Sequence, residues 1–167
     1  TGMQSSGSYR TNVGLVNRGD ADMNATLTLY NATGSTLSTA NVTVPARNFQ
    51  QAPLASFFPE IAGRSYDVLS MRIVADAAES ISAYASVIDN KTQDPIYVQA
   101  MPAPADGSLT VPVVGRAPGA NGTFWRSDVS VFNPNAERLN FSVAYGSSMK
   151  SFSLGDRDTM VLDDVLS

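Results

Sequence analysis

The stretch Tyr9-Arg10-Thr11-Asn12-Val13-Gly14-Leu15-Val16-Asn17 occurs twice in this chain of 167 residues. At an offset of 116 residues it returns as Trp125-Arg126-Ser127-Asp128-Val129-Ser130-Val131-Phe132-Asn133, with Arg, Val and Asn recurring in place. The register continues into residues 23–29 and 139–145, where Asn24 recurs as Asn140. Apolar and polar residues alternate in both copies, which is the period of a half-buried β-strand. Copies at a fixed spacing predict a modular array.

The residue composition favours β-structure. Only 16% of the residues are charged while 43% are hydrophobic, and Ser, Thr and Asn are abundant. Hydrophobic content at this level is enough to build a core. Many Val and Thr residues in short alternating runs, separated by turn signals and with no amphipathic helix, are typical of strands. We therefore predict an all-β fold, an antiparallel immunoglobulin-like β-sandwich with a second copy that is partial or shares strands.

The repeat divides the chain into a first β-sandwich copy at 1–103, a linker at 104–108 and a second, incomplete copy at 109–167. The linker is Pro- and Gly-rich with little to bury. We expect a helical turn at 53–59 and strands at 9–17, 25–30, 36–44, 48–52, 66–75, 80–89, 96–101, 109–114, 125–133, 138–145, 149–154 and 158–162.

The second copy has no counterparts of the strands at 66–75, 80–89 and 95–101. An incomplete sandwich exposes apolar faces and open strand edges. Three sources are open for the missing strands: protein beyond Ser167, fusion of the two copies into one larger sandwich, or edge addition from another chain.

The absence of several residue types narrows the function. A net charge of −4 with no basic cluster argues against a nucleic-acid partner. No apolar run approaches the roughly 18 residues of a membrane span, so membrane insertion is not expected. The chain has no His and no Cys, which removes the usual general base and the commonest metal ligands. No carboxylate pair stands out among Asp156, Asp158, Asp163 and Asp164, so we expect neither enzymatic activity nor a cofactor.

Two overlapping motifs follow the first copy of the repeated stretch. Arg18-Gly19-Asp20 spells a tripeptide that integrins read on exposed turns, although turns favour Gly and Asp in any case. Asp20, Asp22 and Asn24 have the alternate spacing of a calcium loop, but Ala25 replaces the expected Gly and no bidentate Glu follows. A solvated turn is the favoured interpretation, with adhesion and metal binding as alternatives.

Two further features point to the cell surface or to ligand binding. Asn-x-Ser/Thr sequons, the acceptors of N-linked glycans, occur at six positions: Asn24, Asn31, Asn41, Asn90, Asn121 and Asn140. Strand-turn junctions also generate such sequons. Arg10 and Arg126 each follow an aromatic residue, an arrangement that suits a carbohydrate or peptide site. We favour a structural role in which each Arg packs on its ring and pairs with a carboxylate such as Asp128.

The stretch Gly119-Ala120-Asn121-Gly122-Thr123-Phe124-Trp125-Arg126-Ser127-Asp128, followed by Val131-Phe132-Asn133-Pro134, resembles tandem β-sandwich repeats of exported bacterial proteins. Tyr84-Ala85-Ser86-Val87-Ile88-Asp89-Asn90 with Asp94-Pro95 resembles the closing hairpin of the same modules. The resemblance implies an immunoglobulin-like architecture in a surface protein or secreted enzyme, and it brings no catalytic residues.

These observations predict a non-catalytic extracellular module that serves as a spacer, adhesion unit or assembly unit. We expect it to be secreted or on the cell surface, since the chain opens at Thr1, as after removal of a signal peptide or excision of a fragment. Its partners would be proteins, or further copies joined through β-edges. The alternatives are a filament subunit completed by strands from a neighbour and a carbohydrate- or protein-binding accessory module.

Overall fold

Two four-stranded antiparallel sheets form the first repeat unit. The computed structural model describes residues 1–102 and 107–167, so residues 104–106 of the expected linker lie outside the described residues. One sheet has the order β1-β6-β3-β4 and the other the order β5-β2-β7-β8. Their strands are β1 (Met3–Ser5), β2 (Tyr9–Asn17), β3 (Met23–Asn31), β4 (Thr36–Val44), β5 (Phe49–Pro53), β6 (Tyr66–Ala75), β7 (Ile81–Asp89) and β8 (Pro95–Gln99).

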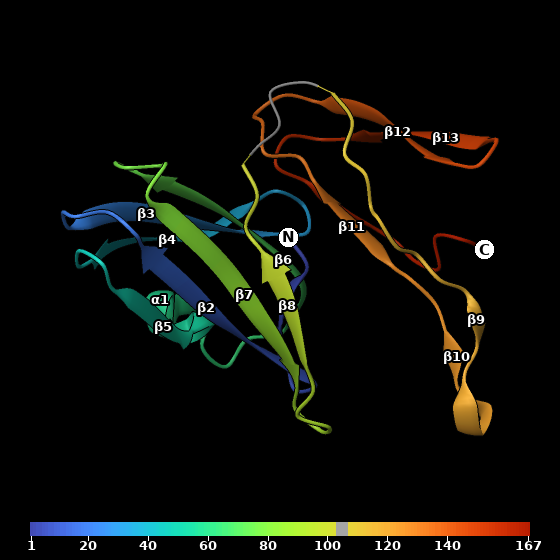
Figure 1. The fold of residues 1–167 in the computed structure, drawn as a ribbon, viewed down its shortest axis with the longest axis horizontal. Coiled ribbons are helices and arrows are strands. Elements are labelled where there is room, and N and C mark those ends of the chain that lie inside the picture. The colour runs from blue at the N-terminus through green and yellow to red at the C-terminus, as the bar shows by residue number, and fades with distance from the viewer. Residues whose placement is uncertain (103–106) are drawn as a thin grey trace.

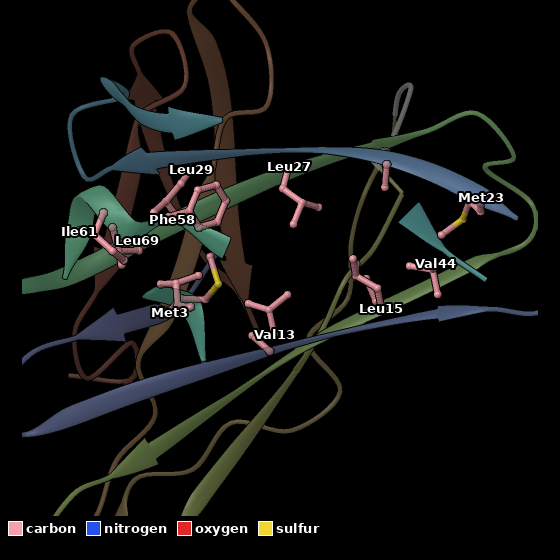
Figure 2. Close-up of a cluster of buried hydrophobic side chains, with 14 residues drawn as sticks. Met3, Val13, Leu15, Met23, Leu27, Leu29, Val44, Phe58, Ile61 and Leu69 are labelled. Atoms are coloured by element: carbon pink, nitrogen blue, oxygen red, sulfur yellow. The ribbon is translucent and has the colours of Figure 1, made fainter. Parts of the chain in front are cut away.

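The two sheets enclose one hydrophobic core, which makes this unit a β-sandwich (Figure 2). Alternate residues of β2 and β3 point inward, so that Val13, Leu15, Leu27 and Leu29 are almost fully buried. Each buried side chain of this size contributes about 1.5–3 kcal/mol through removal of apolar area from water. The inward faces expected from the alternating sequence are confirmed.

A short helical segment closes one end of this sandwich. The helix α1 (Leu54–Phe57) follows Pro53, and the 3₁₀ turn η1 (Pro59–Ile61) follows Phe58. Leu54, Phe58 and Ile61 are buried in the core cluster. The helical turn expected at 53–59 is therefore confirmed, and its apolar residues explain why so short a helix is stable here.

The second unit consists of separate two-stranded sheets (Figure 1). It contains β9 (Ala117–Pro118), the 3₁₀ turn η2 (Ala120–Gly122), β10 (Phe124–Trp125), β11 (Val129–Phe132), β12 (Leu139–Tyr145), β13 (Ser148–Leu154) and β14 (Thr159–Leu162). These strands pair as β9 with β10, β11 with β14 and β12 with β13, all antiparallel.

The two units share the same strand registers. Val16 pairs with Phe49 in the first unit, as Phe132 pairs with Thr159 in the second. Met23 pairs with Val44, as Leu139 pairs with Leu154. Strands β2 to β5 thus correspond to β11 to β14, in the order β2–β11, β3–β12, β4–β13 and β5–β14. The offset falls from 116 residues for β2 and β3 to 110 for β4 and β5, because the β12–β13 hairpin is shorter.

Several expectations from the sequence were wrong. Residues 109–114 form no strand, because no neighbouring strand pairs with them and Pro112 lacks the N–H that a ladder needs. The strand expected at 125–133 is broken at residues 126–128 into β10 and β11. Of the three sources left open for the missing strands, a shared sheet is not seen, since within the described residues no sheet combines strands of both units. The short strand β1, which pairs with β6, was not expected.

The extra hairpin residues of the first unit, 30–37, make the contact with the second unit. Tyr30 packs against Phe132 at a ring-centroid distance of 5.8 Å, and its hydroxyl accepts a hydrogen bond from Arg157 at 2.7 Å. The carbonyl of Ala32 accepts the N–H of Thr159 at 3.0 Å. A Cβ on Gly34 would lie 2.3 Å from the Asp156 carbonyl oxygen. The units are therefore joined by this longer hairpin together with β6, whose Ser70 hydroxyl lies 2.7 Å from the Thr159 hydroxyl.

We expect Gly34→Ala to loosen this joint. Gly34 has φ +74° and a backbone carbonyl in the way, whereas Gly63 has φ +73° and nothing within 4 Å. Gly63→Ala is thus a matched control with the same backbone strain and no clash, and overpacking should cost Gly34→Ala about 1–3 kcal/mol more. Faster amide exchange at Thr159 in Gly34→Ala alone is the expected readout. Equal exchange in both variants would show that the loop does not hold the units together.

Candidate functional site

A buried asparagine holds the turn after β2. Asn17 is 1% exposed, and its Oδ1 accepts the N–H of Gly19 at 2.9 Å. Its Nδ2 donates to the carbonyl oxygens of Ala21, Val44 and Pro45 at 2.8, 3.0 and 3.2 Å. The side chain thereby ties the β2–β3 turn, which crosses from one sheet to the other, to the end of β4. Burial without these partners would cost about 1–3 kcal/mol for each unsatisfied group.

Asn133 repeats this arrangement in the second unit. It is fully buried, and its Oδ1 accepts the N–H of Asn135 at 3.0 Å. Its Nδ2 donates to the carbonyl oxygens of Glu137 and Gly155 at 2.7 and 2.6 Å. We call the two arrangements the asparagine locks. The sequence repeat identified Asn17 and Asn133 as equivalent, and the structure shows what both do.

Each lock includes an arginine that the sequence comparison missed. Arg47 and Arg157 have φ of +51° and +57°, a conformation that residues other than Gly rarely adopt. Their N–H groups donate to the Gly19 and Asn135 carbonyls, both at 3.0 Å. The sequence signal that could have identified them is the change in repeat offset from 116 to 110 residues. This offset aligns Ala46-Arg47-Asn48 with Asp156-Arg157-Asp158.

The Arg18-Gly19-Asp20 tripeptide forms the turn of the first lock. The Arg18 guanidinium donates to the Glu79 carbonyl at 2.9 Å, and the Asp20 carboxylate pairs with Arg47. The Asp20 side chain is nevertheless 78% exposed, and exposed pairs of this kind are worth at most about 1 kcal/mol. The chain's own groups thus engage both ends of the motif. Adhesion through it stays a prediction.

Each of the three calcium-loop candidates has a local partner of its own. Asp20 pairs with Arg47, and Asp22 accepts the N–H of Ala46 at 3.0 Å. Asn24 accepts the hydroxyl of Thr43 at 2.8 Å. Among the described residues no group of three Asp or Glu side chains is placed to hold a metal ion. All three side chains thus have partners within the chain, and metal binding through them stays a prediction.

The six sequons lie in two different environments. Asn24, Asn41, Asn121 and Asn140 are exposed, whereas Asn31 and Asn90 are half-buried. Asn31 accepts the N–H groups of Thr33 and Ser35 at 3.1 and 2.9 Å. A glycan requires a free side-chain amide, so accessibility favours Asn121 and Asn140 over Asn31 and Asn90.

The repeated arginines differ in their partners. Arg10 donates to Asn90 Oδ1 and Gln93 Oε1 at 2.8 and 2.9 Å, both in the β7–β8 turn. Arg126 is exposed and has no hydrogen bond within the described part of the chain. The expected pairing with Asp128 was wrong, because that carboxylate accepts the N–H of Asp164 at 2.8 Å.

The glycine-rich motif before β11 forms a tight closed loop. Gly119 donates its N–H to the Thr123 carbonyl at 2.8 Å, and Asn121 has φ +54°. A Cβ on Gly119 would lie 2.3 Å from Thr123 Oγ1 and 2.5 Å from Trp125 Nε1. A side chain at this position would therefore force the Thr123 and Trp125 side chains to move. Trp125 itself is 68% exposed.

Open strand edges distinguish the second unit from the first. In the described residues β11 pairs only with β14 and β12 only with β13, whereas β2 and β3 each have two neighbours. The stacked pair Phe141 and Phe152, with centroids 5.4 Å apart, lies in the β12–β13 hairpin and is half-exposed. The equivalent positions of the first unit, Ala25 and Val42, lie inside the sandwich.

No protein-family model matches the chain, and no curated protein matches it. In the described ranges, 1–102 and 107–167, no helix combines the length and the apolar character needed to cross a membrane.

We expect Asn17→Ala to lower the free energy of unfolding by about 3 kcal/mol, because the buried Val44 carbonyl and the partly buried Ala21 and Pro45 carbonyls lose this donor. Asn133→Ala should destabilise the second unit in the same way. Asn41→Ala is the control, since Asn41 is exposed and accepts only the Thr26 hydroxyl at 2.9 Å. Urea denaturation measures the difference. Equal midpoints for Asn17→Ala and Asn41→Ala would contradict the lock.

We expect stability of the β7–β8 turn to depend on pH through Asp89. The N–H groups of Thr92 and Lys91 donate to its carboxylate at 3.0 and 2.7 Å and lower the pKa of Asp89. A lowered folded-state pKa gives stability that is present above the unfolded value, about 3.9, and is lost as pH falls through the folded one. Asp89→Asn should reduce this acid sensitivity.

Amide exchange at Lys91 and Thr92 between pH 5 and pH 2 provides the measurement, after correction for intrinsic exchange rates. Asp94→Asn, in the same turn, is the matched control and should leave the profile unchanged. A profile that is the same for Asp89→Asn as for the unaltered chain would rule out Asp89 as the titrating group.

Proposed function

We propose that this chain is a non-catalytic structural or adhesion module of a secreted or cell-surface protein. Its architecture is immunoglobulin-like, and it acts through sandwich packing and the pairing of open strand edges. The observation that carries the proposal is the contrast between β2 and β3, each with two neighbours, and β11 and β12, each with one among the described residues. Unpaired edges are templates for strands of another polypeptide.

The side-chain chemistry supports a structural role. The sequence has no His and no Cys, and the carboxylates of Asp20, Asp22 and Asp128 are each engaged in separate local contacts. The most strongly buried polar side chains with many partners are the asparagine locks, which organise turns. The exposed sequons at Asn121 and Asn140 agree with an extracellular location.

A second candidate function, a subunit of a self-assembling filament, rests on the same open edges. If strands from a neighbouring copy complete the second unit, the contact is heterologous, and repeated contacts of that kind build an open filament. A single unchanging sedimentation coefficient from micromolar to millimolar chain concentration would exclude the filament and leave the module.

The proposed edge pairing predicts a specific pattern of amide exchange in the dilute monomer. The Asn133 N–H faces the β14 side, so the N–H groups of Ser130 and Phe132 face the open edge. We expect these amides to exchange almost as fast as in a peptide, while Gly14 and Val16, paired with β7, are protected to the level of global unfolding. Hydrogen–deuterium exchange followed by NMR resolves both sets.

Protection of Ser130 and Phe132 equal to that of Gly14 and Val16 in the dilute monomer would contradict the proposed function. It would mean that the second unit is complete without a partner.

A further inference from the structure

The residues shared by both copies differ in where their partners lie. Asn17 and Asn133 find their partners in neighbouring turns of their own unit. In the first unit, by contrast, two shared residues reach the segment from β6 to β8. Asn24 donates its main-chain N–H to Asp76 Oδ1 and its Nδ2 to Asp76 Oδ2, both at 3.0 Å.

Arg10 does the same at the other end of the unit, because Asn90 and Gln93 lie between β7 and β8. The second unit has no strands corresponding to β6, β7 and β8 in the described residues, yet it retains Asn140 and Arg126. Both side chains are exposed and, within the described part, unbonded. The second unit thus keeps the residue types that contact the β6–β8 segment in the first unit, while no corresponding strands lie among the described residues.

From this juxtaposition we propose that the second unit is an acceptor site for a partner polypeptide that supplies antiparallel strands with the chemistry of β6 to β8. The first partner strand adds to β12 and ends in a carboxylate. Asn140 donates hydrogen bonds to this carboxylate, as Asn24 does to Asp76 in the first unit. The next strand adds to β11, and a turn with side-chain amides meets Arg126. The inference rests on the proposed edge pairing and specifies the kind of strands that pair with the open edges.

The faces at the open edges match this occupant. Phe141 and Val143 are half-exposed where Ala25 and Leu27 are covered in the first unit. In the first unit Ile73 pairs with Leu27 and Met71 with Leu29, so alternate apolar residues of the added strand face inward. Burial of these side chains removes apolar area from water, which offsets the loss of conformational freedom when the partner becomes ordered.

The chain's own segments suit these edges less well. In residues 109–114 the apolar side chains of Leu109, Val111 and Val113 are exposed, and they would have to point inward. The alternate position Pro112 would then face the edge, where it has no N–H to donate. The β6–β8 strands of a second copy are already paired in their own sandwich, so their transfer would expose one core to cover another.

The test uses the full chain and, as the probe, a fluorescently labelled peptide of residues 66–99 of the same sequence. We expect the peptide to bind, by fluorescence anisotropy, and to protect the amides of Ser130, Phe132, Ser142 and Ala144. Asn140→Ala should weaken binding roughly tenfold, the loss of a hydrogen bond to a charged group. Asn24→Ala is the matched control and should stay within twofold, because the chain's own Asp76 occupies Asn24.

Asp76→Asn in the peptide completes a double-mutant cycle. If Asn140 reads this carboxylate, the losses for Asn140→Ala and Asp76→Asn overlap, and the double change weakens binding by much less than the hundredfold product. Arg126→Ala and Arg10→Ala form a second matched pair, with the loss expected only for Arg126→Ala.

Three results would overturn the inference. The first is that the peptide does not bind although the edge amides exchange freely. The second is that the losses of binding free energy for Asn140→Ala and Asp76→Asn are additive. The third is that amide protection of β12 grows with chain concentration in the absence of peptide. The last would assign the edge to a second copy. None of these three results contradicts the proposed edge pairing itself. That proposal is contradicted only if the edge amides are already protected in the dilute monomer.

Discussion

The buried asparagine at the end of β2 is the constraint on which each unit depends. An antiparallel sandwich must send its chain from one sheet to the other, and the crossing turns carry main-chain groups that no ladder satisfies. Asn17 binds those groups from two turns at once. Asn133 does so again through Gly155 and Asn135, which correspond to Pro45 and Gly19. The lock therefore fixes how β2 and β3 leave their sheets, and the strand registers follow.

The two units have equal strand registers but unequal burial of their inward side chains. This difference separates the contribution of turns and strand pairing from that of hydrophobic burial. Inward side chains of β3 such as Leu27 are fully buried, whereas those of β12 such as Val143 remain half-exposed. Turn chemistry and cross-strand pairing are thus sufficient to specify four strands, but the hydrophobic free energy comes only when both sheets are wide enough to cover each other. The second unit thus shares the strand registers of the first, without a comparable hydrophobic cluster among the described residues.

The sequence predicted the positions of strands well and the hydrogen-bond partners of side chains poorly. Alternation located β2 and β4 to the residue, since a half-buried strand leaves a period of two. The same period misled at residues 109–114, because alternation describes a side-chain pattern and a strand also needs a neighbour. Arg10 was recognised as repeated, but its amide partners lie 80 residues or more away in the chain. Contacts at such separations are set by topology, which one sequence does not display.

The longer hairpin at residues 30–37 has a consequence for how such units could be strung together. Tyr30, Ala32 and Gly34 all meet the second unit, which has only the two-residue turn Gly146-Ser147 at the equivalent place. The second unit therefore presents no such arm to a third. The joint is directional and cannot be propagated by repetition, so an extended row of these units requires at least two kinds of connection, alternating along its length.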